Sequence, residues 1–248
     1  MKTKSQKKRL DVLVVERGLA ESRQKAQAMI LAGEVSVDGA KVEKAGAQVA
    51  ESVRVDVASR LQKYASRGGL KLEGALADFA VNPTGTICLD LGSSTGGFSD
   101  CLLQHGASRV YAVDVNTDQL AWKLQQDPRI VRVKRNAREL RPNDISEPVG
   151  LVVADVSFIS VTKILPPAVR TAKSVATFLI LVKPQFELRR QDIGEGGIVK
   201  DPALHKQAIA SVENAAKSSG LERLGVLPSR LAGAEGNQEF FLHARKIG

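Results

Sequence analysis

The pattern of apolar and polar positions changes along the chain. From about residue 84, short apolar runs alternate with stretches in which apolar residues recur at helical spacing. The expected strands are TICLDLG (86–92), RVYAVDV (109–115), RIVRVKR (129–135), GLVVADVSF (150–158) and ATFLILVKP (176–184), with two more near 222–229 and 239–245. The expected helices lie at 99–106, 118–127 and 202–220. This alternation predicts an α/β fold with a doubly wound, mainly parallel, seven-stranded sheet.

The first 60 residues follow a different pattern. Apolar residues at helical spacing predict one helix that Gly18 ends and a second helix that Ser22 caps. Short alternating segments follow at 34–39 and 53–57, and the first of them ends in a tight Asp-Gly turn. The sequence therefore predicts a small α+β unit of two helices and a small sheet.

Composition limits the class of protein. The 248 residues are 43% apolar and 25% charged, and the longest apolar run, 175–182, is far shorter than the roughly 20 residues of a membrane helix. No apolar stretch of the kind that a secretory signal needs follows the basic N-terminus. Cys88 and Cys101 form no CxxC pair, and the three histidines are scattered. We therefore expect a cytoplasmic protein without a metal site or a disulfide framework.

The net charge of +9 is unevenly distributed. Residues 1–71 hold 15 basic and 8 acidic side chains, whereas residues 72–248 hold 21 and 19. Such asymmetry predicts a polyanionic partner, with nucleic acid and an anionic membrane surface as the candidates. A solubilising tail is the alternative. A second basic stretch, 129–141, has six basic side chains and one acidic, and is expected to extend this surface.

Three short motifs organise the basic front of the chain. They are RLD (9–11), SR (22–23) and GEVSVDG (33–39). This arrangement, over roughly residues 8–60, resembles the S4 RNA-binding domain, in which a helical pair presents basic side chains to structured RNA. The resemblance implies that Arg9, Arg23 and Lys25 bind RNA, and Arg67 is assigned with them. A solvated charge is the alternative for each residue alone, whereas the set favours RNA binding.

The segment LDLGSSTGGFSD (89–100) is a candidate cofactor loop. An apolar strand is followed by Asp90, Gly92 and a Gly-Gly pair that opens a helix, so the backbone can approach a ligand and offer free N–H groups. The chain contains no Walker loop, and this loop lacks the GxG of a dinucleotide fingerprint. These features favour a loop that binds a nucleoside-type cofactor. The alternative is an ordinary strand-to-helix turn.

A second acid, Asp114, ends the next strand 22 residues after Gly92. The strand, loop, helix and spaced acid resemble those of the Rossmann-like class I methyltransferases, which implies S-adenosyl-L-methionine as the cofactor. A carboxylate at this place can accept both ribose hydroxyls, and the resemblance assigns the edge of the adenine to residues after the third strand. The expected cofactor-binding residues are Asp90, Gly92, Ser93, Ser94, Gly96, Gly97, Phe98, Asp114, Asn136 and Ala137.

Four further residues match the Lys-Asp-Lys-Glu pattern of the FtsJ-like ribose 2'-O-methyltransferases. They are Lys71 in SRGGLKL, Asp155 in VADVSF, Lys183 in LVKPQFE and Glu239 in GNQEFF, and we call them the tetrad. The resemblance implies that Lys183 acts on the hydroxyl as base or orienting donor, that Lys71 tunes it electrostatically, and that the two acids hold the lysines. The alternatives are a helix cap for Asp155, an edge-strand charge for Glu239 and an RNA-phosphate contact for Lys71.

The S4-like front joined to this tetrad resembles the TlyA family, known both as haemolysins and as ribosomal RNA 2'-O-methyltransferases. The segments 194–202 and 235–241 share its pattern. The resemblance implies methyl transfer to a ribose 2'-hydroxyl of ribosomal RNA or ribosomal subunits, with cytidine as the nucleotide. A cytolysin and a catalytically silent RNA-binding assembly factor are the competing classes. The expected domains are an S4-like domain with a basic tail (1–60), a linker (61–66) and a methyltransferase domain (67–248).

Aromatic residues make up 4% of the chain, so no extensive stacking platform for single-stranded RNA is expected. Phe158 and Phe186 closely follow two tetrad residues. Packing in the core is favoured for both over contact with a flipped nucleotide.

Overall fold

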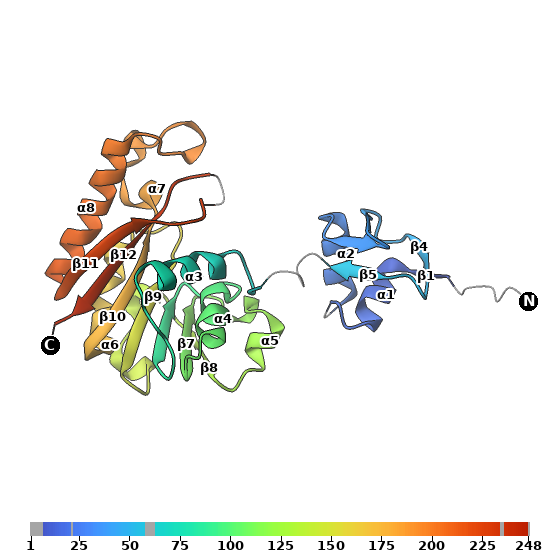
Figure 1. The fold of residues 1–248 in the computed structure, drawn as a ribbon, viewed down its shortest axis with the longest axis horizontal. Helices are drawn as coiled ribbons and strands as arrows, with labels where there is room; N and C mark the ends of the chain where they lie inside the picture. The colour runs from blue at the N-terminus through green and yellow to red at the C-terminus, as the bar shows by residue number, and fades with distance from the viewer. Residues whose placement is uncertain (1–6, 21, 58–62, 234–235, 248) are drawn as a thin grey trace, which may run out of the picture. The chain divides into compact units, whose positions relative to one another are not determined.

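The computed structural model describes residues 7–20, 22–57, 63–233 and 236–247. The chain separates into two units, Met1–Lys63 and Tyr64–Gly248 (Figure 1). Most of the expected basic tail, 1–6, and linker positions 61 and 62 lie outside the described residues. Tyr64, which the sequence analysis assigned to the linker, is buried in the core of the second unit.

In the first unit, two helices pack on short strands. The helices are α1 (Leu10–Glu16) and α2 (Arg23–Leu31), and the strands are β1 (Lys7–Arg9), β2 (Val35–Val37), β3 (Ala40–Lys41), β4 (Gln48–Ala50) and β5 (Val55–Val57). The Ser22 hydroxyl caps α2 by accepting the Lys25 N–H at 3.2 Å. Asp38 and Gly39 both have positive φ, as the two-residue turn between β2 and β3 requires. The predicted α+β unit is confirmed.

The second unit is built on a seven-stranded sheet. Its strands are β6 (Ile87–Leu91), β7 (Arg109–Asp114), β8 (Ile130–Lys134), β9 (Val149–Ala154), β10 (Ala172–Val182), β11 (Leu221–Pro228) and β12 (Phe240–Lys246). Their order is β11-β12-β10-β9-β6-β7-β8, in which β12 runs antiparallel to both neighbours and the pairs from β10 to β8 are parallel. The predicted doubly wound, mainly parallel sheet is confirmed.

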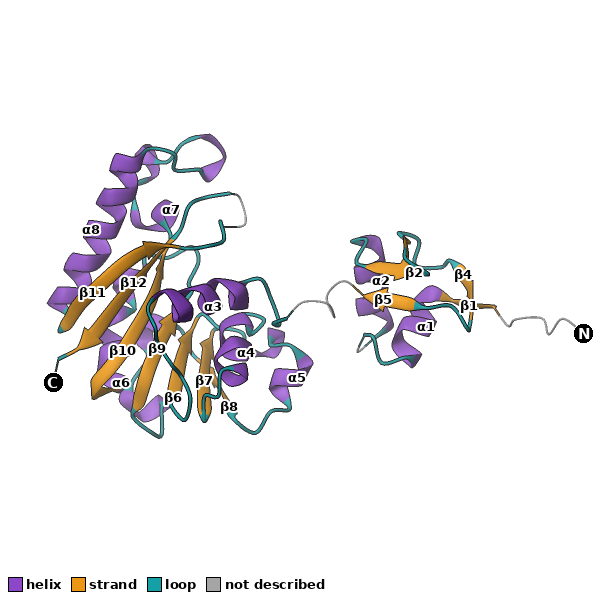
Figure 2. Ribbon diagram, viewed as in Figure 1, coloured by secondary structure: helices purple, strands orange, loops and turns teal. Residues whose placement is uncertain are grey.

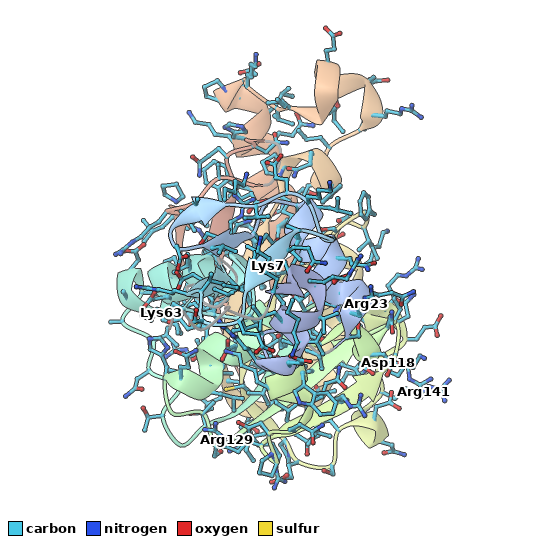
Figure 3. All side chains as sticks on the ribbon, turned by 90° about the vertical axis from the view of Figure 1, so that its right-hand side faces the viewer. Lys7, Arg23, Lys63, Asp118, Arg129 and Arg141 are labelled. Carbon is cyan, nitrogen blue, oxygen red and sulfur yellow. The ribbon has the colours of Figure 1, made fainter. Side chains whose placement is uncertain are left out.

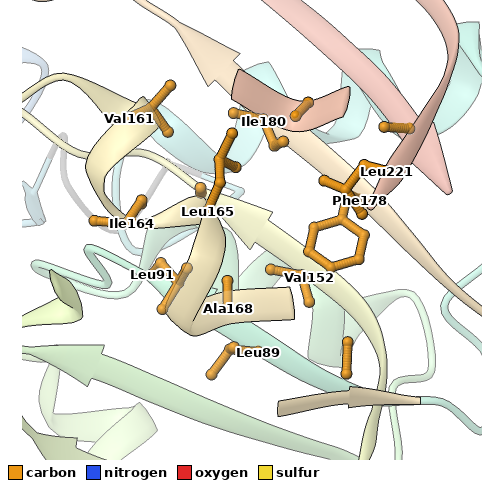
Figure 4. Close-up of a cluster of buried hydrophobic side chains, with 14 of the residues drawn as sticks. Leu89, Leu91, Val152, Val161, Ile164, Leu165, Ala168, Phe178, Ile180 and Leu221 are labelled. Carbon is orange, nitrogen blue, oxygen red and sulfur yellow. The ribbon is translucent and has the colours of Figure 1, made fainter. Parts of the chain in front are cut away.

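Helices cover both faces of this sheet (Figure 2). They are α3 (Gly68–Asp78), α4 (Gly97–Gln104), α5 (Trp122–Gln125), α6 (Leu165–Thr171), α7 (Pro184–Glu187) and α8 (Pro202–Ser218). One apolar cluster joins α3, α4 and α5 to the sheet, and a separate cluster joins α6 and α8 to it. Figure 4 shows Leu165 and Ala168 of α6 beside Leu91 and Val152 in this second cluster. The separation into two clusters defines a three-layer α/β/α unit.

One expected helix is interrupted. The predicted helix 118–127 consists of a 3₁₀ turn, η2 (Thr117–Gln119), and the short helix α5, with Leu120 and Ala121 extended between them. The Gln125 amide donates to the backbone carbonyls of both Asp118 and Leu120, so these carbonyls are satisfied without a continuous helix. Leu120 is buried, and a Cβ at Gly96 would lie 2.9 Å from it. The prediction of one continuous helix was wrong here.

The parallel strands bring their carboxyl ends to one edge of the sheet. The loops after β6, β7, β8, β9 and β10 therefore gather there. Because β12 is antiparallel, its first residue lies at the same edge, where Phe240 pairs with Val182 at the end of β10. This register places Glu239 next to Lys183 along two adjacent strands. Residues that are distant in the sequence thus converge on one edge.

Candidate active site

A cavity of about 560 Å³ opens among the loops after β6, β7, β8 and β9. Of the expected cofactor-binding residues, it is lined by Gly92, Ser94, Asp114, Asn136 and Ala137, and the tetrad residue Asp155 also lines it. The volume lies in the range of small-molecule sites, and the location matches the edge at which α/β sheets bind ligands.

The carboxylate of Asp114 is held in place on the wall of this cavity. Its Oδ2 accepts the backbone N–H of Ser94 at 2.9 Å. Its Oδ1 accepts the backbone N–H of Asn116 at 3.0 Å and the side-chain amide of Gln119 at 3.3 Å. Gln119, which also lines the cavity, was not found from the sequence, and its position five residues after the acid was the available signal.

Two glycines allow the cofactor loop to lie close to its neighbours. Gly92 has φ +81°, and a Cβ there would lie 2.4 Å from the backbone oxygen of Asp155. A Cβ on Gly97 would lie 2.2 Å from Ser66 Oγ and 3.0 Å from the Gly69 nitrogen. The loop is therefore confined between the end of β9 and the start of α3, and any side chain at either position would force these segments apart.

The other expected cofactor-binding residues lie outside the cavity lining: Asp90, Ser93, Gly96, Gly97 and Phe98. Phe98 is buried and its ring stacks on that of Phe241, with 6.2 Å between the centroids. Asp90 is fully buried and its Oδ2 accepts the Ser99 hydroxyl at 2.7 Å. Burial raises the pKa of Asp90 to about 7. Its Oδ1 is buried and has no hydrogen-bond partner among the described residues.

One half of the tetrad is a buried ion pair. Lys71 on α3 and Glu239 before β12 meet with 2.5 Å between Nζ and Oε2. The two side chains are 11% and 3% exposed. Glu239 precedes an internal strand of the sheet, and its carboxylate lies beside Gly233, where a Cβ would come within 2.6 Å of Oε1.

The other half of the tetrad lies between the ends of β9 and β10. Lys183 Nζ lies 2.6 Å from Oδ1 of Asp155. It also donates a hydrogen bond of 2.8 Å to the hydroxyl of Ser157. Lys183 is buried at 8% exposure, and Ser157 and Asp155 line the cavity. The structure thus joins all four tetrad residues into two lysine–carboxylate pairs at the carboxyl edge of the sheet.

The prediction of core packing was wrong for Phe158. Its side chain is 93% exposed, and its backbone has φ +63°, which is rare for a residue with a Cβ. The chain bends at this residue, and the ring lies outside the core. Phe186, on α7, is partly buried, and the two ring centroids lie 5.4 Å apart. The pair forms a small aromatic surface at the rim of the cavity, which Phe158 lines.

Two of the expected RNA-binding residues in the first unit have a structural role. Asp11 is fully buried, and it accepts hydrogen bonds from Arg9 at 2.8 and 3.0 Å and from Arg23 at 3.0 Å. The hydrogen bonds from Arg9 and the neighbouring donors hold the pKa of Asp11 well below its usual range. Lys25 and Arg67 are both exposed, Lys25 on α2 and Arg67 before α3.

The basic stretch 129–141 is partly neutralised by acids. Arg129 pairs with Asp127 at 2.7 Å and Arg135 pairs with Asp144 at 2.8 Å. Asp118 lies 3.6 Å from Arg132 and 3.9 Å from Lys134. Figure 3 shows the side chains of Asp118, Arg129 and Arg141 at the periphery of the second unit. These acids reduce the excess positive charge that the sequence alone indicates for this stretch.

Two polar residues that the sequence analysis did not single out connect the loops around the tetrad. The Glu187 carboxylate accepts the Ser160 hydroxyl at 2.5 Å and the Val161 N–H at 2.8 Å, and burial raises its pKa. Asn237 accepts the Val199 N–H at 2.8 Å and donates to the Gly197 carbonyl at 2.9 Å. The available signal was their proximity in the sequence to Lys183 and Glu239.

The described parts of the chain contain neither a metal-ligand cluster nor a membrane-spanning helix. Within these residues, no group of three or more His, Cys, Asp or Glu side chains could hold a metal ion. None of the helices described here is long and apolar enough to cross a membrane.

The sheet, the cavity at its carboxyl edge and the tetrad define the second unit as a Rossmann-like methyltransferase domain. The sequence profile of FtsJ-like methyltransferases matches residues 64–246, and that of the S4 domain matches residues 8–55. Over nearly its whole length, the chain belongs to the TlyA family.

Three similar proteins carry two kinds of name. The chain is 45% identical over 239 residues to the 16S/23S rRNA (cytidine-2'-O)-methyltransferase TlyA of Mycobacterium tuberculosis, covering 96% of this chain and 89% of that one. It is 40% identical over 237 residues to Hemolysin A of Brachyspira hyodysenteriae, covering 95% and 98%. A solved structure from Streptococcus thermophilus that carries a hemolysin name has a TM-score of 0.75 and 39% identity, covering 98% and 90%.

Proposed function

We propose that this protein transfers a methyl group from S-adenosyl-L-methionine to the 2'-hydroxyl of a ribose in ribosomal RNA, with cytidine as the nucleotide. The observation that carries this proposal is the convergence of two lysine–carboxylate pairs, Lys71–Glu239 and Lys183–Asp155, at the edge where the cavity opens. The relative from M. tuberculosis, named as a cytidine-2'-O-methyltransferase, supports the choice of nucleotide.

The cavity fits S-adenosyl-L-methionine in size and in the polar groups around it. Asp114, fixed by three donors, is oriented to accept the ribose hydroxyls of the cofactor. Asn136 and Ala137 line the part of the cavity after β8, where we assign the adenine. The buried, unpartnered Oδ1 of Asp90 is available to a donor of the cofactor or to a bound water.

The chemical task of the tetrad is to prepare the hydroxyl. When bound, the cofactor supplies a methyl group that the positive sulfur activates. A ribose hydroxyl is a poor nucleophile while protonated, so the protein must align it and help to remove its proton. We assign this step to the Lys183 amine, which Asp155 holds at 2.6 Å. Lys71 contributes positive charge nearby, and Glu239 fixes its position.

The RNA is proposed to bind mainly through its phosphates and shape. The N-terminal domain, expected over residues 1–60, carries Arg9, Arg23 and Lys25, and Arg67 continues the set at the start of α3. We propose that residues 67–248 carry out methyl transfer. Because ribosomal RNA is the proposed substrate, we propose that the protein acts in the cytoplasm.

Transfer of radiolabelled methyl from S-adenosyl-L-methionine to ribosomal subunits and to naked ribosomal RNA lacking the modification tests the proposal. We expect label on ribose. Lys183→Ala is expected to lower transfer at least about 100-fold while cofactor binding, measured by calorimetry, survives. Cofactor binding without labelling of any RNA would contradict the proposal and favour a catalytically silent RNA-binding assembly factor.

A cytolysin is the second candidate, because two similar proteins carry hemolysin names. Release of haemoglobin from erythrocytes by purified, detergent-free protein tests it. Release by both the wild type and Lys183→Ala would support a lytic activity independent of the tetrad. No release, together with methyl transfer to RNA, is the result we expect.

A further inference from the structure

We infer that Ser157 is a positioning residue for methyl transfer, because its hydroxyl fixes the Lys183 amine beside the cavity. This inference rests on the proposed function. Lys183 Nζ has two oxygen neighbours, Asp155 Oδ1 at 2.6 Å and Ser157 Oγ at 2.8 Å. Both come from the loop after β9, and both residues line the cavity. The amine is therefore held at the cavity wall by two contacts that differ in chemistry.

The hydroxyl can serve Lys183 in both of its protonation states. A protonated amine can donate to both oxygens. A neutral amine has a lone pair, which a carboxylate cannot satisfy but which a hydroxyl can by donating its own hydrogen. Ser157 can thus keep the amine in place before and after it takes up a proton. Lys71 instead contacts the carboxylate of Glu239, which only accepts. This difference assigns the proton-accepting role to Lys183 and a fixed cationic role to Lys71.

The backbone that carries Ser157 is fixed on its C-terminal side. The next residue, Phe158, has φ +63°, a strained conformation that persists only where the surroundings hold it. Glu187 provides such a hold, since it binds the Ser160 hydroxyl and the Val161 N–H from α7. Helix α7 begins directly after Lys183. Glu187 on α7 therefore links the segment that carries the Lys183 amine to the loop that carries the Ser157 hydroxyl.

Ser157 is exposed, so its replacement should leave the fold intact. Ser157→Ala removes the hydroxyl, Ser157→Cys nearly preserves its size with a much weaker hydrogen-bonding group, and Ser157→Thr preserves the hydroxyl. We expect Ala and Cys each to lower kcat for methyl transfer about 10-fold to 100-fold. The dissociation constant of S-adenosyl-L-methionine should change less than about threefold, and Thr should recover at least about half of kcat.

Ser174→Ala is the matched control, because Ser174 is an exposed serine on β10 at the opposite end of the strand from Lys183. It should retain full activity. A purely structural role for Ser157 would lower thermal stability and cofactor affinity together with kcat. Wild-type kcat in Ser157→Ala or Ser157→Cys, or failure of Ser157→Thr to exceed Ser157→Ala, would overturn the inference.

A second measurement does not require activity. In protein labelled with ¹⁵N-lysine, the Nζ signal of Lys183 is assigned by its loss in Lys183→Arg. We expect Ser157→Ala to shift this signal and to speed its hydrogen exchange, whereas Ser174→Ala leaves it unchanged. An unchanged signal in Ser157→Ala would overturn the inference even if the wild type methylates RNA. A shifted signal without methylation by the wild type would instead support the contact and contradict the proposed function.

Discussion

Lys71 Nζ lies 2.5 Å from Glu239 Oε2, although the two residues are 168 positions apart in the sequence. One comes from the helix before the first strand of the sheet, and the other precedes its last strand. Both side chains are almost fully buried. The contact therefore joins the two ends of the methyltransferase domain at the carboxyl edge of its sheet.

Breaking the Lys71–Glu239 pair should destabilise the fold. Lys71→Met leaves the buried Glu239 without its partner, and Glu239→Gln leaves the buried Lys71 without an opposite charge. Each change should lower the free energy of unfolding by about 3 kcal/mol. The double variant should lose less than the sum of the two, by about 1–3 kcal/mol, because the partners are in contact. Denaturant unfolding of the four proteins measures this coupling.

The exposed pair Arg245–Glu222 serves as the control for that cycle. Glu222→Gln should change the free energy of unfolding by less than about 1 kcal/mol. Additive losses for Lys71→Met and Glu239→Gln would show that the pair does not act as a unit.

Asp90 should make stability depend on pH. Its pKa is about 7 in the fold, against an ordinary value of 3.8. Between these values the folded protein binds more protons than the unfolded one, so stability is present in full below about pH 4 and falls as pH rises through 7. Asp90→Asn should remove up to about 1.4 kcal/mol per pH unit from this slope. Unfolding measured from pH 4.5 to 8 without cofactor tests it, and parallel curves for both proteins would contradict it.

Asp114 should determine affinity for the cofactor. Asp114→Ala removes the proposed acceptor for the ribose hydroxyls and should weaken binding of S-adenosyl-L-methionine about 10-fold to 100-fold in calorimetry. Asp118→Ala, on an exposed acid four residues later, should leave the dissociation constant within about twofold. Equal affinities for Asp114→Ala and the wild type would exclude Asp114 from the cofactor site.

Phe158 should matter for RNA and not for folding. Phe158→Ala removes an exposed ring, so thermal stability should be unchanged, whereas the KM for RNA should rise about fivefold or more if stacking on a base is lost. Phe178→Ala, in the core, should instead cost about 3–5 kcal/mol of stability. A KM for RNA that Phe158→Ala leaves unchanged would remove the aromatic surface from substrate binding.

The two kinds of basic residue on the first unit should respond differently. Lys25→Gln should reduce the slope of log affinity against log salt by about one and leave stability unchanged. Arg23→Gln should reduce the slope similarly and also lower stability, because it removes a donor to the buried Asp11. RNA binding at several salt concentrations, combined with thermal unfolding, separates these effects. A flat salt response in the wild type would contradict electrostatic recognition.

Much of the fold could be predicted from local pattern. All seven strands of the sheet were expected. Strands β6, β7, β9 and β10 are largely buried apolar runs, whereas β8 alternates apolar and basic residues. The glycines of the loop at 89–100 indicated a ligand-binding turn. Helix α3 was not predicted, because its GGLKL start lacks a side-chain cap. The break at Leu120–Ala121 was also missed, since it depends on the tertiary contacts of Gln125 and Leu120.

Of the ten residues expected to bind the cofactor, five line the cavity, and the pairing within the tetrad was not predicted. The tetrad was inferred by resemblance, but which lysine meets which acid depends on the antiparallel register of β12, which no local pattern encodes. The exposure of Phe158 was missed because a lone aromatic residue after an apolar strand usually packs inside. In the structure, Phe158 has a positive φ and is exposed, and this backbone conformation could not be expected from the sequence.

The place of β12 in the sheet also determines when the tetrad can assemble during synthesis of the chain. Strand β12 is made after β11, yet it inserts between β11 and β10. A growing chain that has already exposed Lys71, Asp155 and Lys183 therefore still has an open gap in its sheet and an unpartnered Lys71. The tetrad is completed only when the last strand enters this gap, so we expect a partly made chain that lacks β12 to be inactive in methyl transfer.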